Sequence, residues 1–234
     1  MKKLLLFALL FAVKESTACT TCNKQIQQGI YNSTFLPNLL TMLSAFIVLA
    51  IIIFILSILN TRKHKSTFTN SGSSVLNPVP LTTAAMVLGI GLGGFVDGIF
   101  FHQILQWHEM LSNKLPPVDL VTKSVNMFWD GVFHFFCLVV VLIGTILLWK
   151  LLKRKDINSS GKLLTAGLLQ GFAIFNIVEG IIDHHLLKLH NVREITDNTD
   201  LWNFGFLGVS FIMLVIGLIL TKQGAKDAKA AHTS

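Results

Sequence analysis

Long apolar runs recur along the sequence and are separated by short polar segments. A helix that crosses the hydrocarbon core of a bilayer needs about 20 predominantly apolar residues. Five runs reach this length, at residues 38–59, 81–107, 125–149, 163–187 and 201–220. Backbone polar groups in lipid must be satisfied within the segment itself, so these runs are expected to be helices. The pattern predicts an all-α protein, a polytopic membrane helix bundle with five transmembrane helices.

The first 18 residues have the pattern of a cleaved signal peptide. Two lysines precede an apolar stretch at residues 4–13, which is too short to span a membrane, and a polar region follows it. The mature chain is expected to begin near Cys19, on the outer side of the membrane. Cys19 and Cys22 form the motif CTTC there, which leaves three alternatives open: a disulfide, a soft-metal site, or lipidation of Cys19.

Clusters of basic residues follow the first, third and fifth predicted spans. They lie at residues 62–65, 150–155 and 222–229. All three fall on one predicted side, and cytoplasmic loops carry the excess of Lys and Arg in membrane proteins. The signal peptide independently places the mature N-terminus on the other side. We therefore predict a bacterial inner-membrane protein with a periplasmic N-terminus and a cytoplasmic C-terminus.

The composition agrees with a membrane protein. Of the 234 residues, 52% are hydrophobic and 13% are charged, which is more apolar than a soluble domain of this size. The net charge of +7 comes from the clusters between apolar runs, so the expected partner is the lipid bilayer and no nucleic acid is expected. The predicted segments are a signal peptide (1–18), an outer CxxC segment with the first transmembrane helix (19–60), a cytoplasmic linker (61–80), a four-helix membrane domain (81–221) and a cytoplasmic tail (222–234).

One pattern of glycine, acid and histidine occurs twice. The segment DGIFFHQILQWH at residues 97–108 aligns without gaps on EGIIDHHLLKLH at residues 179–190, with five of twelve positions identical. Both segments lie at the outer ends of outward-running spans, so the last four helices are expected to form two hairpins related as parallel repeats. A weaker echo, WD at 129–130 and WN at 202–203, extends to the second helix of each hairpin.

Ionisable side chains gather in the outer halves of these spans, although each costs about 2–3 kcal/mol or more in lipid. Imidazole and carboxylate together suit transition metals, so the cluster predicts a metal site for Cu, Fe or Zn, which the residues do not distinguish. The expected ligands are His102 and His184, one from each repeat, joined by His134 from the third span. The other candidate site residues are Asp97, Asp130, Glu179, Asp183, His108, His185 and His190.

Helix geometry limits this hypothesis. In an α-helix His184 lies about 140° round from Glu179, so one helix is not expected to supply every ligand. His108 and His190 would lie near the surface, about 9 Å further out than the first histidine of each repeat, as an access site or behind the ligands. A purely structural role is the alternative, with interfacial histidines and with Asp97 and Glu179 as a protonated pair that locks the helices together.

The segments GFVDGIFFHQILQWHEML, MFWDGVFHFF and NIVEGIIDHHLLKLHNVRE resemble a family of bacterial four-helix membrane proteins catalogued as a domain of unknown function. The resemblance covers residues 81–220 and implies the fold, without an activity. Some relatives look fused to a copper-related assembly factor of the caa3-type cytochrome oxidase, which implies a respiratory oxidase or its assembly factors as partners. The N-terminal section, with CTTC and a span of its own, departs from the plain four-helix form.

Three functions fit these observations. The favoured one is a metal-binding protein with a periplasm-facing site, in metal handling or respiratory oxidase assembly. A membrane redox enzyme with haem or a non-haem metal is the second, so whether the chain is an enzyme stays open. The third is a proton or cation transporter in which Asp97 and Glu179 relay the charge, although the inner halves of the spans lack comparable polar residues.

Overall fold

The structure, a computed structural model, describes residues 23–68, 79–151, 153–154, 157 and 160–230. The predicted signal peptide, Cys19 and Cys22 lie outside these residues. The described part of the chain forms helices joined by loops and contains no strand. Five of its helices are long and apolar enough to cross a membrane, which confirms the predicted all-α fold with five spans.

The helices follow one another as in the prediction, with different ends. In chain order they are α2 (Lys24–Ile30), α3 (Phe35–Phe68), α4 (Val79–Val96), the π-helix η2 (Asp97–Ile104), α5 (Leu120–Leu151), α6 (Gly161–Glu179), the π-helix η3 (Gly180–Leu186) and α7 (Thr199–Ala230). α3 thus extends into the predicted linker. α5 begins at Leu120, five residues before the predicted span, because its polar first turn is capped. Asp119 Oδ1 accepts from Thr122 N at 2.8 Å, and Thr122 Oγ1 accepts from Asp119 N at 3.1 Å.

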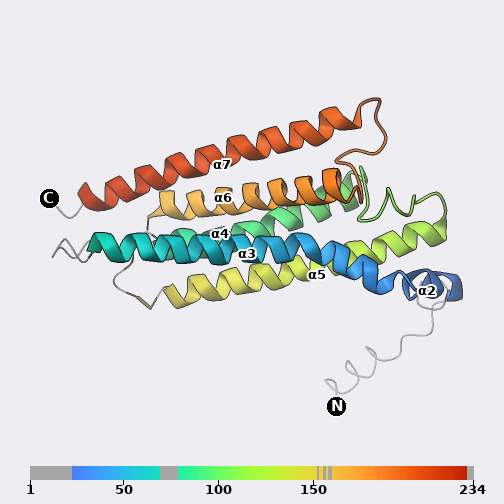
Figure 1. The fold of residues 1–234 in the computed structure, drawn as a ribbon, viewed down its shortest axis with the longest axis horizontal. Coiled ribbons are helices and arrows are strands. Elements are labelled where there is room, and N and C mark those ends of the chain that lie inside the picture. The colour runs from blue at the N-terminus through green and yellow to red at the C-terminus, as the bar shows by residue number, and fades with distance from the viewer. Residues whose placement is uncertain (1–22, 69–78, 152, 155–156, 158–159, 231–234) are drawn as a thin grey trace, which may run out of the picture.

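α4 and α6 form the centre of the bundle. They pack against each other, with α5 beside α4 and α7 beside α6, while α3 lies across α4 and α6 (Figure 1). Glycines allow the central contact: a Cβ at Gly89 would overlap the Leu168 carbonyl, and one at Gly171 would overlap the Met86 carbonyl. Such small residues are typical of close helix packing in membranes.

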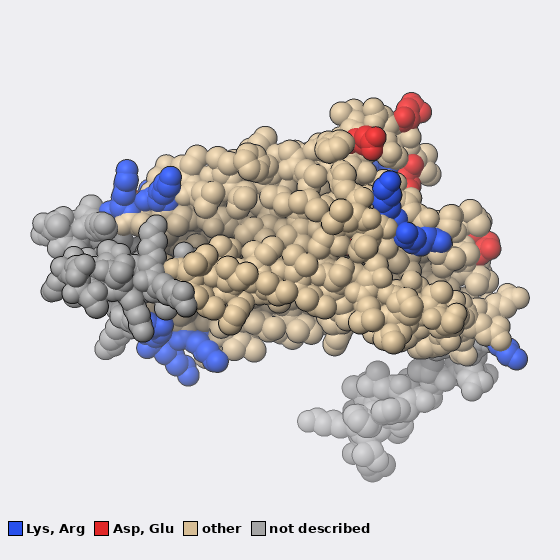
Figure 2. Space-filling view, in the orientation of Figure 1, with Lys and Arg blue, Asp and Glu red and all other residues tan. Residues whose placement is uncertain are grey.

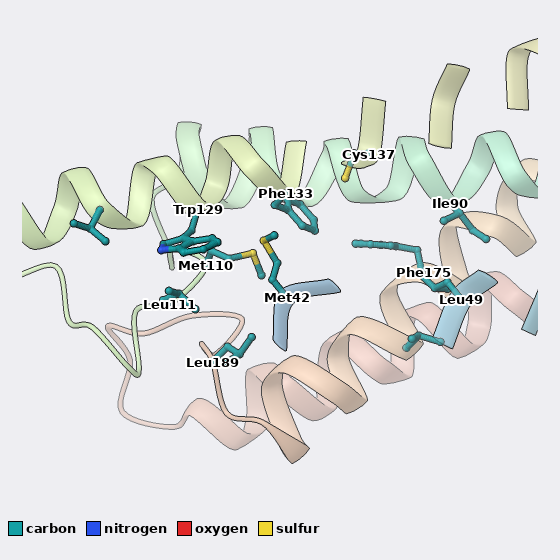
Figure 3. Close-up of a cluster of buried hydrophobic side chains, with 12 residues drawn as sticks. Met42, Leu49, Ile90, Met110, Leu111, Trp129, Phe133, Cys137, Phe175 and Leu189 are labelled. Carbon is teal, nitrogen blue, oxygen red and sulfur yellow. The ribbon is translucent and has the colours of Figure 1, made fainter. Parts of the chain in front are cut away.

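The hydrophobic core lies between these helices and extends to the loops that follow η2 and η3. Phe133 and Phe175 pack at its middle (Figure 3). Met110, Leu111 and Leu189, which come from the two loops, are buried in the same cluster (Figure 3). The loops are therefore anchored to the bundle by burial of apolar side chains, and the backbone between η2 and α5 is held in one place.

The outer surface of the bundle is apolar. Large hydrophobic side chains of α3, α5 and α7, such as Phe54, Leu142 and Phe211, are more than half exposed. Figure 2 shows that the charged side chains of the described residues lie toward the two ends of this face, with a wide uncharged band between them. An exposed apolar belt of this extent contacts the lipid bilayer.

Candidate metal centre

α4 and α6 each continue into a π-helix at the same end of the bundle. η2 begins at Asp97, and η3 follows Glu179 directly. A π-helix bonds residue i to residue i+5, so side chains five positions apart lie about one turn apart on the same face. His102 follows Asp97 by five positions and His184 follows Glu179 by five. The change of helix type therefore places each histidine beside its preceding acid.

The distances agree with this geometry. His102 Nε2 lies 3.1 Å from Asp97 Oδ2, and His184 Nε2 lies 2.8 Å from Glu179 Oε1. The expectation that His184 lies about 140° from Glu179 is wrong, because it assumed α-helical geometry through residues that form a π-helix.

Two residues after the end of each π-helix, a residue with left-handed backbone conformation turns the chain back toward the bundle. Gln106 has φ 50° and Lys188 has φ 49°. The backbone bonds before the two turns also match: Leu105 N donates to Phe100 O at 2.9 Å, and Leu187 N donates to Ile182 O at 2.7 Å. All three pairs of positions are 82 residues apart.

The turn at Lys188 can be tested because a left-handed backbone costs an L-residue with a side chain about 1–2 kcal/mol. Lys188 is exposed, so its side chain contributes little packing. We expect Lys188→Gly to unfold at or above the wild-type temperature in detergent, and Lys188→Val to be destabilised by about 1–2 kcal/mol, since β-branched residues rarely adopt positive φ. Equal thermal unfolding of the two variants would contradict this account of the turn.

The turns bring the second histidine of each segment back against the first. The ring centroids of His102 and His108 are 4.4 Å apart, and those of His184 and His190 are 4.9 Å apart. His108 is 3% exposed and His190 is fully buried. The expectation that both lie near the surface, about 9 Å further out, is wrong because the helix ends before them and the chain reverses.

Fixed acceptors orient these rings. His108 Nδ1 donates to the Val192 carbonyl at 2.8 Å, and His190 Nδ1 donates to the Met110 carbonyl at 3.1 Å. Each carbonyl belongs to the loop of the other half and lies two residues after that half's histidine. A carbonyl only accepts, so Nδ1 carries the proton, and in the neutral ring Nε2 carries the lone pair that a metal needs.

Asp130 of α5 does the same for His102. Its Oδ1 accepts from His102 Nδ1 at 2.8 Å and from the Met110 amide at 2.9 Å. In the other half Asn203 Oδ1 accepts from the Val192 amide at 2.9 Å. Asp130 and Asn203, the second residues of the WD and WN pairs, thus each accept a hydrogen bond from a loop amide of their own half. Asp130 acts as the acceptor behind His102 instead of pointing to the ligand atoms itself.

Ligand atoms converge in two groups at this end of the bundle. In each group, one ligand atom from every member lies within 4.8 Å of the others: the first group is His102, His108 and His190, and the second is Glu179, His184 and His190. All five residues are at least 97% buried. Nε2 of His102, His108 and His184 has no hydrogen-bond partner in the described residues. The contacts of His102 and His184 with carboxylates are therefore close approaches without hydrogen-bond geometry.

The remaining predicted site residues take different places. Asp183 is 1% exposed, and its Oδ1 has no hydrogen-bond partner among the described residues. His134 is half-buried, stacks on Phe95 and lies beside Gly98, outside both groups. His185 Nδ1 donates to the Gly180 carbonyl at 2.8 Å, and its ring packs near Phe204. Neither of these two histidines reaches the converging nitrogens.

Electrostatics distinguish the two histidines outside the spans. Burial and the neighbouring His102 and His190 rings hold the pKa of His108 well below its usual value. Burial by itself would also lower the pKa of His190, but its hydrogen bond to Glu179, at 3.1 Å from Nε2 to Oε1, outweighs that effect and raises the pKa. His108 thus presents a neutral nitrogen, whereas Glu179 Oε1 accepts the proton on His190 Nε2.

Sequence reasoning missed Glu109 and the two loop carbonyls. Glu109 is 7% exposed, and burial, with Asp130 nearby, raises its pKa. Its position directly after His108 in the sequence could have indicated that Glu109 lies beside the cluster. The carbonyls of Met110 and Val192 had none, because every residue carries a carbonyl and only the chain reversal aims these two at histidines.

The five apolar helices and the buried histidine and acid cluster define a polytopic α-helical membrane protein. The chain belongs to the family described as "Predicted membrane protein (DUF2243)", whose pattern matches residues 84–224. This match confirms the family resemblance of the sequence. No curated protein and no solved structure matches the chain.

Proposed function

We propose that this protein binds a transition metal ion in the buried cluster and serves in metal handling on the periplasmic side of the inner membrane. One observation carries the proposal: the Nδ1 protons of His102, His108 and His190 are held by fixed acceptors, and one ring nitrogen of each histidine lies within 4.8 Å of those of the other two. Histidines that bind metals typically donate their other N–H to a carboxylate or a backbone carbonyl in this way.

Buried charge supports the proposal. Asp97, Asp130, Glu179 and Asp183 are each at most 3% exposed. In the described part of the chain, the ion pairs of the first three have histidine as their partner. Buried carboxylates are costly unless they are paired or bind a cation. A bound cation neutralises them, and imidazole with carboxylate suits Cu(II), Fe or Zn.

The position of basic residues supports a periplasm-facing site. Lys150 lies in the last turn of α5, and Lys222 lies in the last third of α7. The C-terminal ends of α5 and α7 lie at the opposite end of the bundle from the loops after η2 and η3 (Figure 1). Cytoplasmic ends carry the excess of basic residues, so the cluster lies at the opposite, outer end. The matching turns, glycine contacts and loop hydrogen bonds of the two halves support two hairpins arranged as parallel repeats.

Delivery of a metal to a respiratory oxidase, or to its assembly factors, fits a site at this boundary. Ligands from both hairpins meet under the two loops, so movement of one hairpin against the other would alter the ligand set. Among the proposed roles, holding and transferring an ion therefore suits this arrangement best.

Metal analysis of tag-free protein purified in detergent tests the proposal. We expect a stoichiometric transition metal in the wild type and its loss in the double variant His102→Ala, His184→Ala. His185→Ala is the matched control, because His185 lies in η3 next to His184 but bonds to Gly180, and it should keep the metal. Wild-type protein that stays metal-free after incubation with Cu, Fe and Zn salts would overturn the proposal.

The same preparation tests the haem alternative. The rings of His108 and His190 are parallel within 1°, with centroids 4.6 Å apart, which leaves no room for a porphyrin between this pair. We therefore expect no Soret band in the absorption spectrum. A Soret band that disappears in the double variant would assign haem and replace the proposed ion site.

A further inference from the structure

The ligand atoms form two groups that share a single residue. His102 and His108 occur in one group, Glu179 and His184 in the other, and His190 in both. His190 Nδ1 is occupied by the Met110 carbonyl, so only one lone pair, on Nε2, is available to an ion. Two ions, one in each group, could therefore not both bind His190, so His190 can belong to only one of two ion sites.

The two halves of the molecule divide the ligands evenly. Asp97, His102 and His108 form what we call the Asp97 triad, and Glu179, His184 and His190 form the Glu179 triad. Within the Asp97 triad, Oδ2 lies 3.1 Å from His102 Nε2 and Oδ1 lies 3.9 Å from His108 Nε2, so each oxygen faces one histidine. Within the Glu179 triad, Oε1 lies 2.8 Å from His184 Nε2 and 3.1 Å from His190 Nε2.

These separations suit ligands of a common ion. With metal–ligand bonds of about 2.1 Å, adjacent ligands lie about 3.0–3.4 Å apart, and opposite ligands lie no more than about 4.2 Å apart. The carboxylate–nitrogen distances of both triads stay within this limit, from one oxygen in Glu179 and from one oxygen to each histidine in Asp97. Two imidazoles with one carboxylate are a known ligand set for divalent first-row metals, and they leave further positions open.

The buried charge also matches two ions. With neutral histidines and all four carboxyl groups ionised, Asp97, Asp130, Glu179 and Asp183 would carry four negative charges, each at most 3% exposed. One divalent cation would leave two of these charges uncompensated, whereas two cations balance all four. Asp183 is buried in η3, and its Oδ1, which has no hydrogen-bond partner among the described residues, suits a carboxylate that bridges the ions.

We infer that the site is a dinuclear centre, in which the Asp97 triad holds one divalent transition metal ion and the Glu179 triad holds a second. This inference rests on the proposed function, since it requires that the cluster binds metal. Protein sites with two metals typically hold them about 3.5–4 Å apart. That spacing is short enough for magnetic coupling between the ions.

Titration of apo wild-type protein with Cu(II) tests the inference. We expect binding to saturate at two equivalents per chain, with a half-field electron paramagnetic resonance signal from the coupled pair. Two double variants each remove two ligands of one triad. The first combines Asp97→Asn with His102→Ala, and the second combines Glu179→Gln with His184→Ala. Each should bind one equivalent and show an uncoupled Cu(II) spectrum, while His185→Ala should behave as the wild type.

The outcomes separate the inference from the proposed function. Saturation of the wild type at one equivalent, or two equivalents without coupling, would overturn the dinuclear centre and leave the metal-binding function intact. Binding of no Cu(II), Fe(II) or Zn(II) would overturn both. If a triad variant does not fold, the stoichiometry and spectrum of the wild type still decide the question.

Discussion

Gly171→Ala is expected to push α6 away from α4 and to lower the free energy of unfolding by about 3 kcal/mol or more, as overpacking against rigid neighbours does at its upper end. The added Cβ would overlap the Met86 carbonyl and lie 2.9 Å from Ile90 N. These are backbone atoms of a helix, which cannot rotate aside as a side chain can. The separation would also spread the two triads, so the bound metal should be lost together with stability.

Thermal unfolding in detergent and metal content measure this effect. Gly205→Ala is the matched control, because a Cβ at Gly205 on α7 meets no atom within 4 Å. Alanine is a better helix former than glycine, so the control should be neutral or more stable by up to about 1 kcal/mol. A Gly171→Ala protein as stable as the control would show that the α4 and α6 contact does not hold the site together.

Asp130→Asn is expected to weaken metal binding by about 10–100-fold while the fold is kept. Its carboxylate accepts the Nδ1 proton of His102, and replacing this ionised acceptor by a neutral amide is expected to lower metal affinity by the factor seen when partners of ligating histidines are changed. The amide oxygen of asparagine still accepts from the Met110 N–H, as Asn203 accepts from Val192 in the other half. The loop should therefore stay in place.

Metal affinity measured by competition with a chelator gives the result for Asp130→Asn. Asp200→Asn is the control for charge: Asp200 is an exposed acid at the same end of the bundle, and its replacement should leave the affinity unchanged. A wild-type affinity in Asp130→Asn would mean that His102 needs no ionised acceptor to bind the metal. An equal loss in both variants would assign the effect to overall charge.

The features that the sequence predicted correctly, the five spans and the repeated acid and histidine segments, depend on patterns among residues close together in the chain. Hydropathy found the five spans because each run must match the bilayer thickness by itself. Comparison of residues 97–108 with 179–190 identified the acids and histidines that form both triads, since a duplicated pattern repeats its side chains at fixed spacing. The start of α5 was missed because the Asp119 and Thr122 cap permits a polar first turn that hydropathy does not detect.

The geometry of the site depended on features that the pattern does not contain. The expected ion shared by His102, His184 and His134 assumed α-helices continuing to the surface. Instead, η2 and η3 place each acid beside its histidine, and the turns at Gln106 and Lys188 return a second histidine to each pair. His134 lies against Gly98, and Asp130 on the same helix accepts from His102 instead.

By itself the sequence determined an all-α membrane protein with five spans and a set of histidines and acids at one end, because hydropathy and residue spacing are properties of the chain alone. Only the tertiary structure decided which nitrogens converge and which acceptors orient them. The physical reason is that the π-helices, the left-handed turns and the loop carbonyls are held by contacts between α4, α6 and the loops of opposite halves. Those contacts join residues about 80 positions apart, and no local pattern records them.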